Sequence, residues 1–149
     1  LPPAKHGEFE RQLKGQQDGL NRLTVEEFLE NVANPVKRNP IVARKARKQM
    51  QDKLEQRILD DLPDDLSPRE AQRTAAKLAK ETMATLAALH NPDLTAGGRD
   101  VIADFGDKQV NSTIGPQWKS KIKGIQQAAE EALKSGGDAS FMNIKLIKC

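Results

Sequence analysis

The feature that most constrains the fold is a series of helix-start signals spaced along the chain. The strongest is Ser-Pro-Arg-Glu at 67–70, which combines a capping serine, a first-turn proline and the glutamate of a capping box. Thr-Val-Glu-Glu at 24–27 is a second capping box, and Asn39-Pro40 is a third start. Repeated starts of this kind predict separate helices joined by turns.

Stop signals complete the expected helix boundaries. One helix should run from Val25 to Ala33, because the following Asn-Pro disfavours helical geometry. A second should run from Pro40 to about Asp60. A third, mostly buried, should begin at 67–70 and continue to His90, where Asn-Pro again prevents continuation.

The remaining segments carry weaker signals. The glycine-containing first twenty residues predict irregular structure around a short helical piece. Residues 101–105 predict one helical turn, and the polar stretch 106–115 predicts a loop. A last helix is expected from Pro116 or Gln117 to Lys134, followed by a short strand or an extended arm at 141–147.

Composition indicates a single, mainly helical domain. The chain has 149 residues, enough for one core, and only 3% aromatic residues, which argues against a large sheet. Cys149 is the only cysteine, so an internal disulfide and a cysteine-based zinc cluster are excluded. No apolar stretch is long enough to span a membrane. We therefore expect residues 1–149 to form one compact all-α domain of about four to six helices with long polar loops.

Charge is distributed unevenly although the net charge is only +3. Residues 37–57 contain eight basic residues against two acids, whereas residues 58–107 contain ten acids against five bases. The basic run is either a solvated helix face or a surface that binds phosphates. The best candidates for such contacts are Lys37, Arg38, Arg44, Lys45, Arg47 and Lys48.

The motif His90-Asn91-Pro92-Asp93 places a proton-transfer group close to a carboxylate. Hydrolysis of a phosphodiester needs a group that takes a proton from water, and positive charge beside the phosphate. His90 suits the first task, and Asp93 could hold a divalent metal that supplies the second. Gly97 and Gly98 would let the backbone approach a phosphate. The alternative is structural, because a histidine in a last helical turn and an aspartate cap are common.

A second polar group follows about twenty residues later. Its members, which could ligate metal, orient water, bind phosphate or serve as turn and cap residues, are Asp107, Asn111, Ser112 and Gln117. Asp107 is the best second metal ligand beside Asp93. Trp118 begins an amphipathic helix and is expected to anchor the core rather than to stack on bases.

Three segments, at 9–24, 90–98 and 106–118, together resemble the polymorphic toxin type 15 domain, a family marked by an H-x-x-D motif. The motif matches at His90 and Asp93. The resemblance implies a bacterial toxin module with nuclease activity on DNA. It also implies that the N-terminal segment folds back against the site, with family-like residues at Glu10, Arg11, Gln12, Gln16 and Asn21.

The resemblance further implies partners and a destination. We expect a metal-dependent, largely sequence-nonspecific DNase that uses Mg²⁺ or Mn²⁺. It would be the C-terminal module of a longer secreted carrier, such as a type VI secretion effector. The module would be delivered into the cytoplasm of a target bacterium, and a cognate immunity protein would hold it inactive in the producer.

Three other functions stay open from the sequence. RNA is the nearest alternative substrate, because an electrostatic groove does not separate two kinds of phosphodiester. A non-enzymatic helical module could bind nucleic acid or protein through the basic run, with His90 and Asp93 purely structural. A hydrolase of another phosphate ester is the third, and no motif supports it.

Overall fold

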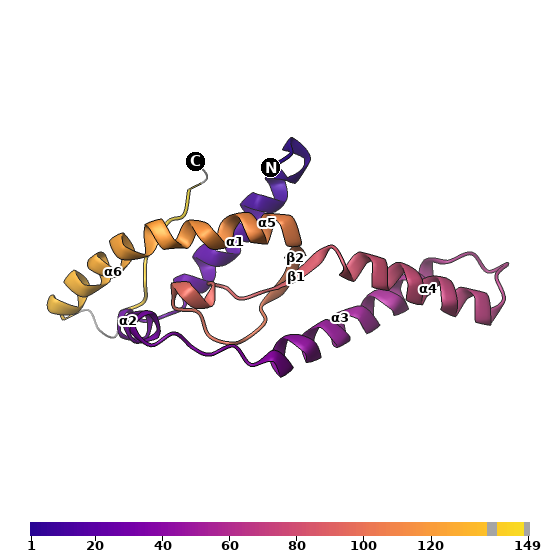
Figure 1. Ribbon diagram of the computed structural model, residues 1–149, viewed down its shortest axis with the longest axis horizontal. Helices are drawn as coiled ribbons and strands as arrows, with labels where there is room; N and C mark the ends of the chain where they lie inside the picture. The colour runs from indigo at the N-terminus through magenta and orange to yellow at the C-terminus, as the bar shows by residue number, and fades with distance from the viewer. Residues whose placement is uncertain (137–139, 148–149) are drawn as a thin grey trace.

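The computed structural model describes residues 1–136 and 140–147. The elements of this part, in chain order, are η1 (Pro3–Lys5), α1 (His6–Leu20), α2 (Val25–Ala33), α3 (Pro40–Asp61), α4 (Pro68–Met83), β1 (Leu86–Leu89), η2 (Leu94–Ala96), β2 (Asp104–Asp107), α5 (Lys108–Ile114), η3 (Gly115–Gln117) and α6 (Trp118–Lys134). Figure 1 shows two regions. Helices α3 and α4 form an antiparallel pair, here called the arm, that projects from a body made by the other elements.

The three predicted helix starts are confirmed. The side chains of Thr24, Asn39 and Ser67 each accept a hydrogen bond from a first-turn backbone amide, at 3.1, 3.0 and 3.2 Å. These bonds satisfy amides that have no partner within the helix. The expected boundaries of α2, α3 and the last helix also match closely. Local capping chemistry was therefore sufficient to place the starts of α2, α3 and α4.

The predicted continuation of the third helix to His90 is wrong. Helix α4 ends at Met83, and Leu86–Leu89 forms strand β1, which pairs antiparallel with β2 in the register Leu86↔Asp107 to Leu89↔Asp104. Leu-Ala-Ala-Leu favours helix intrinsically, so tertiary pairing has overridden propensity. Arg47 stabilises the break, because its guanidinium donates to the carbonyl oxygens of Met83 and Leu86.

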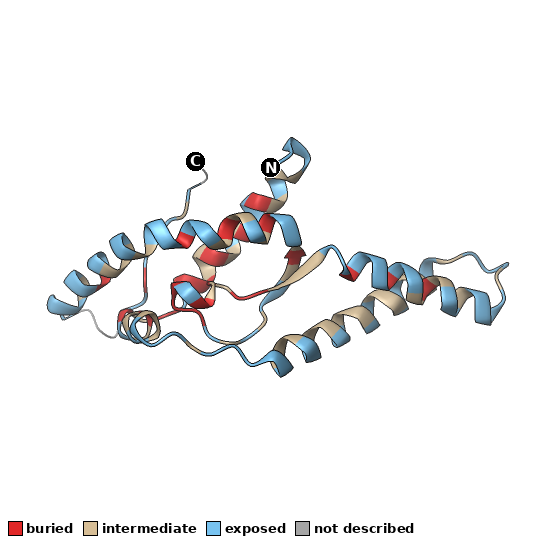
Figure 2. Cartoon of the chain, viewed as in Figure 1, coloured by how far each residue is buried: buried red, intermediate tan, exposed pale blue. Residues whose placement is uncertain are grey.

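Helix α4 is also far less buried than predicted. Only Ala75, Ala79 and Met83 are buried along it, and the rest of the helix is exposed or half-buried. Figure 2 shows the reason, since α4 packs mainly against α3 and the two helices project from the body with most of their surface exposed. The alanine stripe therefore allows two helices to approach, rather than marking a helix inside a bundle.

The N-terminal segment is regular, contrary to the expectation of irregular structure. It forms α1, and its glycines serve packing. Gly15 and Gly19 are one helical turn apart and face the chain at Asn91 and Pro92. A Cβ atom at Gly19 would lie 2.0 Å from the backbone oxygen of Asn91, so only glycine permits this approach.

The stretch after the motif also differs from prediction. Residues 104–107 form β2 instead of a helical turn, and 108–114 form α5 instead of a loop. Asp107 is the N-cap of α5, where its side chain accepts the Val110 amide hydrogen at 3.0 Å. Because this segment is rich in turn-forming residues, its composition did not indicate the short helix α5.

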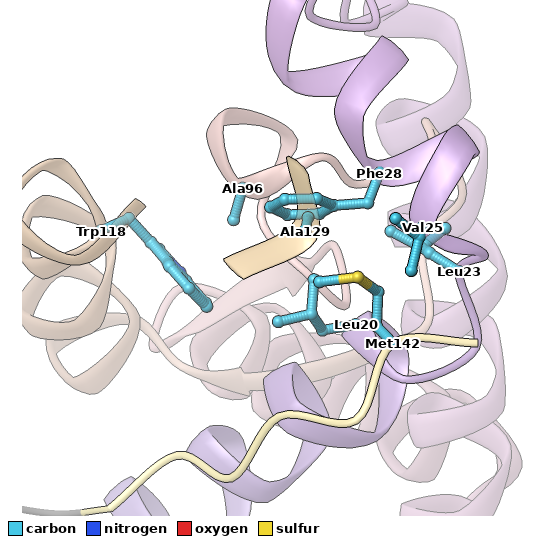
Figure 3. Packing of buried hydrophobic residues seen from close by; sticks show 8 residues of the cluster. All are labelled: Leu20, Leu23, Val25, Phe28, Ala96, Trp118, Ala129 and Met142. Carbon is cyan, nitrogen blue, oxygen red and sulfur yellow. The ribbon is translucent and has the colours of Figure 1, made fainter. Parts of the chain in front are cut away.

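The core lies in the body, between α1, α2, η2, α6 and the C-terminal segment. Figure 3 shows its main cluster, which consists of Leu20, Leu23, Val25, Phe28, Ala96, Trp118, Ala129 and Met142. Trp118 has only 4% of its surface exposed, which confirms the expected core anchor. A second cluster joins α1 to α5 through Phe9, Val110 and Ile114.

The C-terminal segment, residues 141–147, is extended, which is one of its two predicted forms. Met142 donates its amide hydrogen to the oxygen of Leu23, and Ile144 donates to the Asn21 side chain. The fold is therefore mainly helical, as expected, but it is not all-α because of the β1–β2 pair. Among the described helices, none has both the length and the apolar character needed to cross a membrane.

Candidate active site

A cleft of about 300 Å³ lies where the arm joins the body, and it contains the H-x-x-D motif. Its walls come from the residues just before α3, the first half of α3, strand β1, the loop after β1 and helix α5. The lining residues are Arg38, Ala43, Arg47, Leu86, Ala87, Ala88, His90, Asp93, Lys108 and Asn111. Both motif residues therefore face one small volume, even though His90 follows a strand and not a helix.

His90 is held by a carboxylate that the sequence interpretation did not single out. Its Nε2 atom lies 2.8 Å from Oδ1 of Asp100, and only 6% of the His90 side chain is exposed. The other oxygen of Asp100 accepts the backbone amide hydrogen of Asn39 at 2.6 Å. The Asn39 amide, followed by the bond from His90, lowers the pKa of Asp100 below its ordinary value.

Asp93 uses only one side-chain oxygen for structure. Oδ1 accepts hydrogen bonds from the amide and the hydroxyl of Thr95, both at 3.2 Å, and so caps η2. Oδ2 has no hydrogen-bond partner among the described residues. The predicted capping role and the predicted site role are therefore compatible, because each concerns a different oxygen.

Gln16 of α1 fixes the backbone of the motif. This residue is 5% exposed, and its amide nitrogen donates to the oxygen of His90 at 2.7 Å and to the side chain of Asn91 at 3.0 Å. Its oxygen accepts from the backbone of Asp93 at 2.8 Å and from Trp118 Nε1 at 3.2 Å. The expectation that the N-terminal segment folds back against the motif is thus confirmed.

Three cations line the cleft. Arg38 and Arg47 belong to the predicted phosphate-binding set, whereas Lys108 does not. Arg47 also ties α3 to the break between α4 and β1. The other predicted contacts are exposed and lie outside the cleft, and they are Lys37, Arg44, Lys45 and Lys48. Lys48 pairs with Asp52.

The second polar group is dispersed. Asn111 lines the cleft, but Ser112 and Gln117 are exposed and donate to backbone oxygens one helical turn earlier in the chain. Asp107 is not among the lining residues. Its carboxylate caps α5 and pairs with Lys5 at 3.1 Å, and both contacts hold its pKa below the ordinary value. The structure therefore does not bring Asp93 and Asp107 to one cleft.

The metal site that the cleft could form is one with few protein ligands. No group of three or more His, Cys, Asp or Glu side chains that could hold a metal occurs in the described ranges, 1–136 and 140–147. The cleft is lined by the carboxylate of Asp93, whose Oδ1 is engaged by Thr95, and by the side-chain amide of Asn111. Magnesium is often held by one or two carboxylates, with phosphate oxygens and water completing its shell. These residues suit such a cation, rather than one enclosed by protein ligands alone.

Gly97 and Gly98 do not line the cleft, contrary to prediction. Gly97 has a left-handed φ of 85° and packs against Phe28, and Gly98 is buried against the backbone of Pro92. Their role is to let η2 turn tightly and pack closely. No phosphate can approach these buried positions.

The sequence interpretation missed two residues of the site, namely Asp100, which contacts His90, and Lys108, which lines the cleft. Asp100 lies ten residues after His90 in a region already noted as acidic, but nothing local distinguishes it from Asp104 or Asp107. Lys108 is the first residue of α5 and directly follows β2, the strand that pairs with β1 before His90. Predicting the β1–β2 hairpin would have indicated both residues, because the pairing of its strands brings residues 100–108 back beside the motif.

The comparisons with known proteins agree with the motif segments. No curated protein matches the chain. The profile of the family described as Novel toxin 15 matches residues 3–147, which is nearly the whole chain. The three segments that suggested a toxin domain all fall inside this match, and on that evidence the chain belongs to the Novel toxin 15 family.

Proposed function

We propose that this toxin domain is a nuclease that hydrolyses phosphodiester bonds in DNA. The observation that carries the proposal is the convergence, in one cleft, of an imidazole, a carboxylate with one free oxygen, an amide and three cations. Acid–base groups supply proton transfer, and cations favour the negative charge that develops on the phosphate. The surrounding fold holds these groups without using all of their polar atoms.

In the proposed reaction, His90 accepts a proton from a water molecule as the water oxygen bonds to phosphorus. The ester P–O bond then breaks, and the leaving oxygen takes a proton from solvent. The products are one phosphate monoester end and one hydroxyl end. Arg38 and Lys108 would bind the non-bridging phosphate oxygens, and Arg47 would add charge from the wall of the cleft.

A divalent cation, Mg²⁺ or Mn²⁺, completes the proposed site, with Asp93 and Asn111 as its protein ligands. When bound, it would supply positive charge beside the phosphate. Asp93 would orient the cation through Oδ2, because Oδ1 is engaged by Thr95.

We propose largely sequence-independent recognition. The apolar part of the cleft consists of small or aliphatic side chains such as Ala43 and Ala87, and no aromatic residue on which a base could stack is among the described residues that line it. Arginine and lysine contacts to phosphates give affinity without reading bases. Such a site suits a toxin that damages a genome at many positions.

Family membership supports the proposed biological setting. Toxin domains of this kind imply a larger carrier polypeptide and a cognate immunity protein. We therefore propose a secreted effector, of the type VI kind or a similar one, that acts in the cytoplasm of a target bacterium. The immunity protein would protect the producer.

The test uses purified protein with supercoiled plasmid and, separately, with total RNA, each with Mg²⁺, with Mn²⁺ and with a chelator. We expect metal-dependent nicking of plasmid. His90→Ala should reduce the nicking rate at least ~100-fold by removing the base, and Asp93→Asn should do so by weakening the cation site. His6→Ala, which removes the only other histidine, is the matched control and should cleave normally.

Other results would redirect or end the proposal. Cleavage of RNA but not plasmid would replace DNA with RNA as the substrate. Unchanged cleavage in a folded His90→Ala variant would remove the assigned base. Absence of cleavage under every metal condition, with nucleic-acid binding intact, would favour the non-enzymatic module.

A further inference from the structure

One carboxylate, that of Asp100, connects the imidazole of the motif with the start of the arm. Its two oxygens contact different parts of the chain, His90 at 2.8 Å and the Asn39 amide at 2.6 Å. Asn39 is the N-cap of α3, and the preceding residue, Arg38, lines the cleft. The side chains of His90 and Asp100 are only 6% and 12% exposed, so the contact between them is largely shielded from water.

We propose that Asp100 is a positioning residue that holds His90 with Nδ1 as its proton acceptor and keeps Arg38 beside that acceptor. The proposal deepens the proposed nuclease function and rests on it for its catalytic consequence. Asp100 itself would touch neither the phosphate nor the attacking water. It would act through His90 on one side and through the Asn39 backbone on the other.

The tautomer follows from the chemistry of the two partners. The Asn39 backbone amide donates to one oxygen of the Asp100 carboxylate, and the pKa of this carboxyl group is lowered, so it is ionised at neutral pH and can only accept hydrogen bonds. The hydrogen between His90 and Asp100 must therefore be on Nε2. In the neutral ring, Nδ1 then carries the lone pair that takes a proton.

The other ring nitrogen is available for this task. Nδ1 has no hydrogen-bond partner among the described residues. Among the described residues, every fully buried side-chain nitrogen or oxygen has a hydrogen-bond partner. Because Nδ1 has none, it must keep some accessible surface. Because His90 lines the cleft, we place the accessible side of Nδ1 there. The charged groups that share the cleft with the ring are Asp93, Arg38, Arg47 and Lys108.

The decisive variant is Asp100→Asn, which keeps the size of the side chain. Its amide can donate to Nε2, and this favours the tautomer with hydrogen on Nδ1. We expect kcat for plasmid nicking to fall at least ~100-fold, since reversing the tautomer of a catalytic histidine costs up to ~10⁴-fold. KM should change less than about threefold, and Asp100→Glu should recover part of kcat.

Asp104→Asn is the matched control. Asp104 lies only four residues after Asp100, but it is half-exposed, pairs with Arg11 and does not line the cleft. We expect this variant to nick plasmid at nearly the normal rate. A decrease equal to that of Asp100→Asn would overturn the proposal, because it would indicate a general effect on the segment.

A spectroscopic test does not depend on activity or on the variant folding. In ¹⁵N NMR of the unaltered protein at about pH 9, where imidazoles are neutral, the His90 ring should show hydrogen on Nε2 and a bare Nδ1. The opposite tautomer would overturn the proposal. If this signature is found but neither DNA nor RNA is cleaved, the proposed nuclease function fails while the positioning of the ring stands.

Discussion

The body and the arm solve different problems with different residues. In the body, α1, α2 and α6 bury aromatic and aliphatic side chains around a common core. In the arm, α3 has no buried residue and α4 buries only small side chains and one methionine. The body therefore fixes geometry through packing, whereas the arm presents charge to solvent. At a site between them, the body can position the reacting groups and the arm can contribute affinity for phosphates.

The cleft reflects this division. His90, Asp93 and Asn111 come from the body, Arg47 comes from the arm, and Arg38 lies just before the arm begins. Two contacts couple the regions near the site, namely Asp100 with Asn39 and Arg47 with the end of α4 and β1. Changes in the body should therefore damage stability and chemistry together, whereas changes at exposed arm residues outside these two contacts should alter binding alone.

The largest expected effect comes from Gly19→Ala. The new Cβ would lie 2.0 and 2.2 Å from the backbone oxygen and carbon of Asn91, which cannot move without displacing the motif. We expect the free energy of unfolding to fall by at least about 3 kcal/mol, measured by urea titration. Gly7→Ala in the same helix meets nothing within 4 Å and should stabilise by up to about 1 kcal/mol. Equal effects would show that α1 does not pack closely against the motif.

A somewhat smaller effect is expected from Gln16→Leu. Leucine fills the space but leaves the amide of Asp93 and the indole N–H of Trp118 without their acceptor. Each buried polar group left without a partner costs about 1–3 kcal/mol, and partial access of water should limit the total decrease to about 2–3 kcal/mol. Nicking should fall at least ~10-fold, because the motif backbone loses its support.

The control for Gln16→Leu is Gln127→Leu on the exposed part of α6. It makes the same chemical change without removing a buried hydrogen bond. We expect unfolding and nicking to stay within experimental error of the unaltered protein. If Gln16→Leu behaves in the same way, the hydrogen bonds of Gln16 do not hold the motif.

Prediction from sequence succeeded where the cause was local. The starts of α2, α3 and α4 follow from Thr24, Asn39 and Ser67, whose side chains cap the helices they precede. It failed where distant contacts decide. Strand β1 contradicts the helix propensity of its own residues, and the glycines of α1 are explained only by the chain at 91–92 that packs on them.

The residues of the candidate site also divide into those that local sequence indicates and those that depend on distant contacts. The H-x-x-D motif and part of the basic run could be singled out because residue type and spacing carry a chemical meaning. Asp100 could not, because its significance comes from a hairpin that returns it to His90 after ten residues. Asp107 illustrates the opposite error, since an aspartate suited to metal binding is engaged as a helix cap. Residue type indicates what a side chain can do, and topology decides which partner it meets.

A prediction of intermediate size concerns pH and the contact between α1 and β2. Glu8 accepts hydrogen bonds from Arg11, Gln12 and the Asp107 amide, and these contacts, Arg11 foremost, lower its pKa to about 2. The folded-state pKa lies below the unfolded value, so the resulting stability is present above about pH 4.5 and disappears as the pH falls toward 2. Arg11 is about half exposed, and solvent screening reduces the contribution to about 1 kcal/mol.

The measurement compares Glu8→Gln with the unaltered protein in urea at several pH values. We expect the variant to be less stable by about 1 kcal/mol at pH 7, and this difference should shrink steadily between about pH 4.5 and 2. Glu10→Gln, at an exposed position of the same helix, should show no such trend. A pH-independent difference for Glu8→Gln would mean that charge contributes nothing to this contact.

The smallest effect on stability is expected in the arm, from the double variant Arg44→Gln with Lys45→Gln. Both residues lie on α3, between the cleft residues Ala43 and Arg47, and neither is buried, so unfolding should change by less than about 0.5 kcal/mol. Binding of duplex DNA, measured in the His90→Ala background so that the DNA stays intact, should weaken. The slope of log K against log salt should become shallower by about 0.9 for each phosphate that the arm no longer neutralises.

The double variant Lys119→Gln with Lys123→Gln makes the matched change in charge on the exposed surface of α6, which does not line the cleft. If the arm supplies affinity, this control should alter the salt slope less than the α3 variant does. Equal changes would mean that DNA responds to net charge alone. The arm would then have no special part in binding, and the division of labour between arm and body would reduce to the packing of the body.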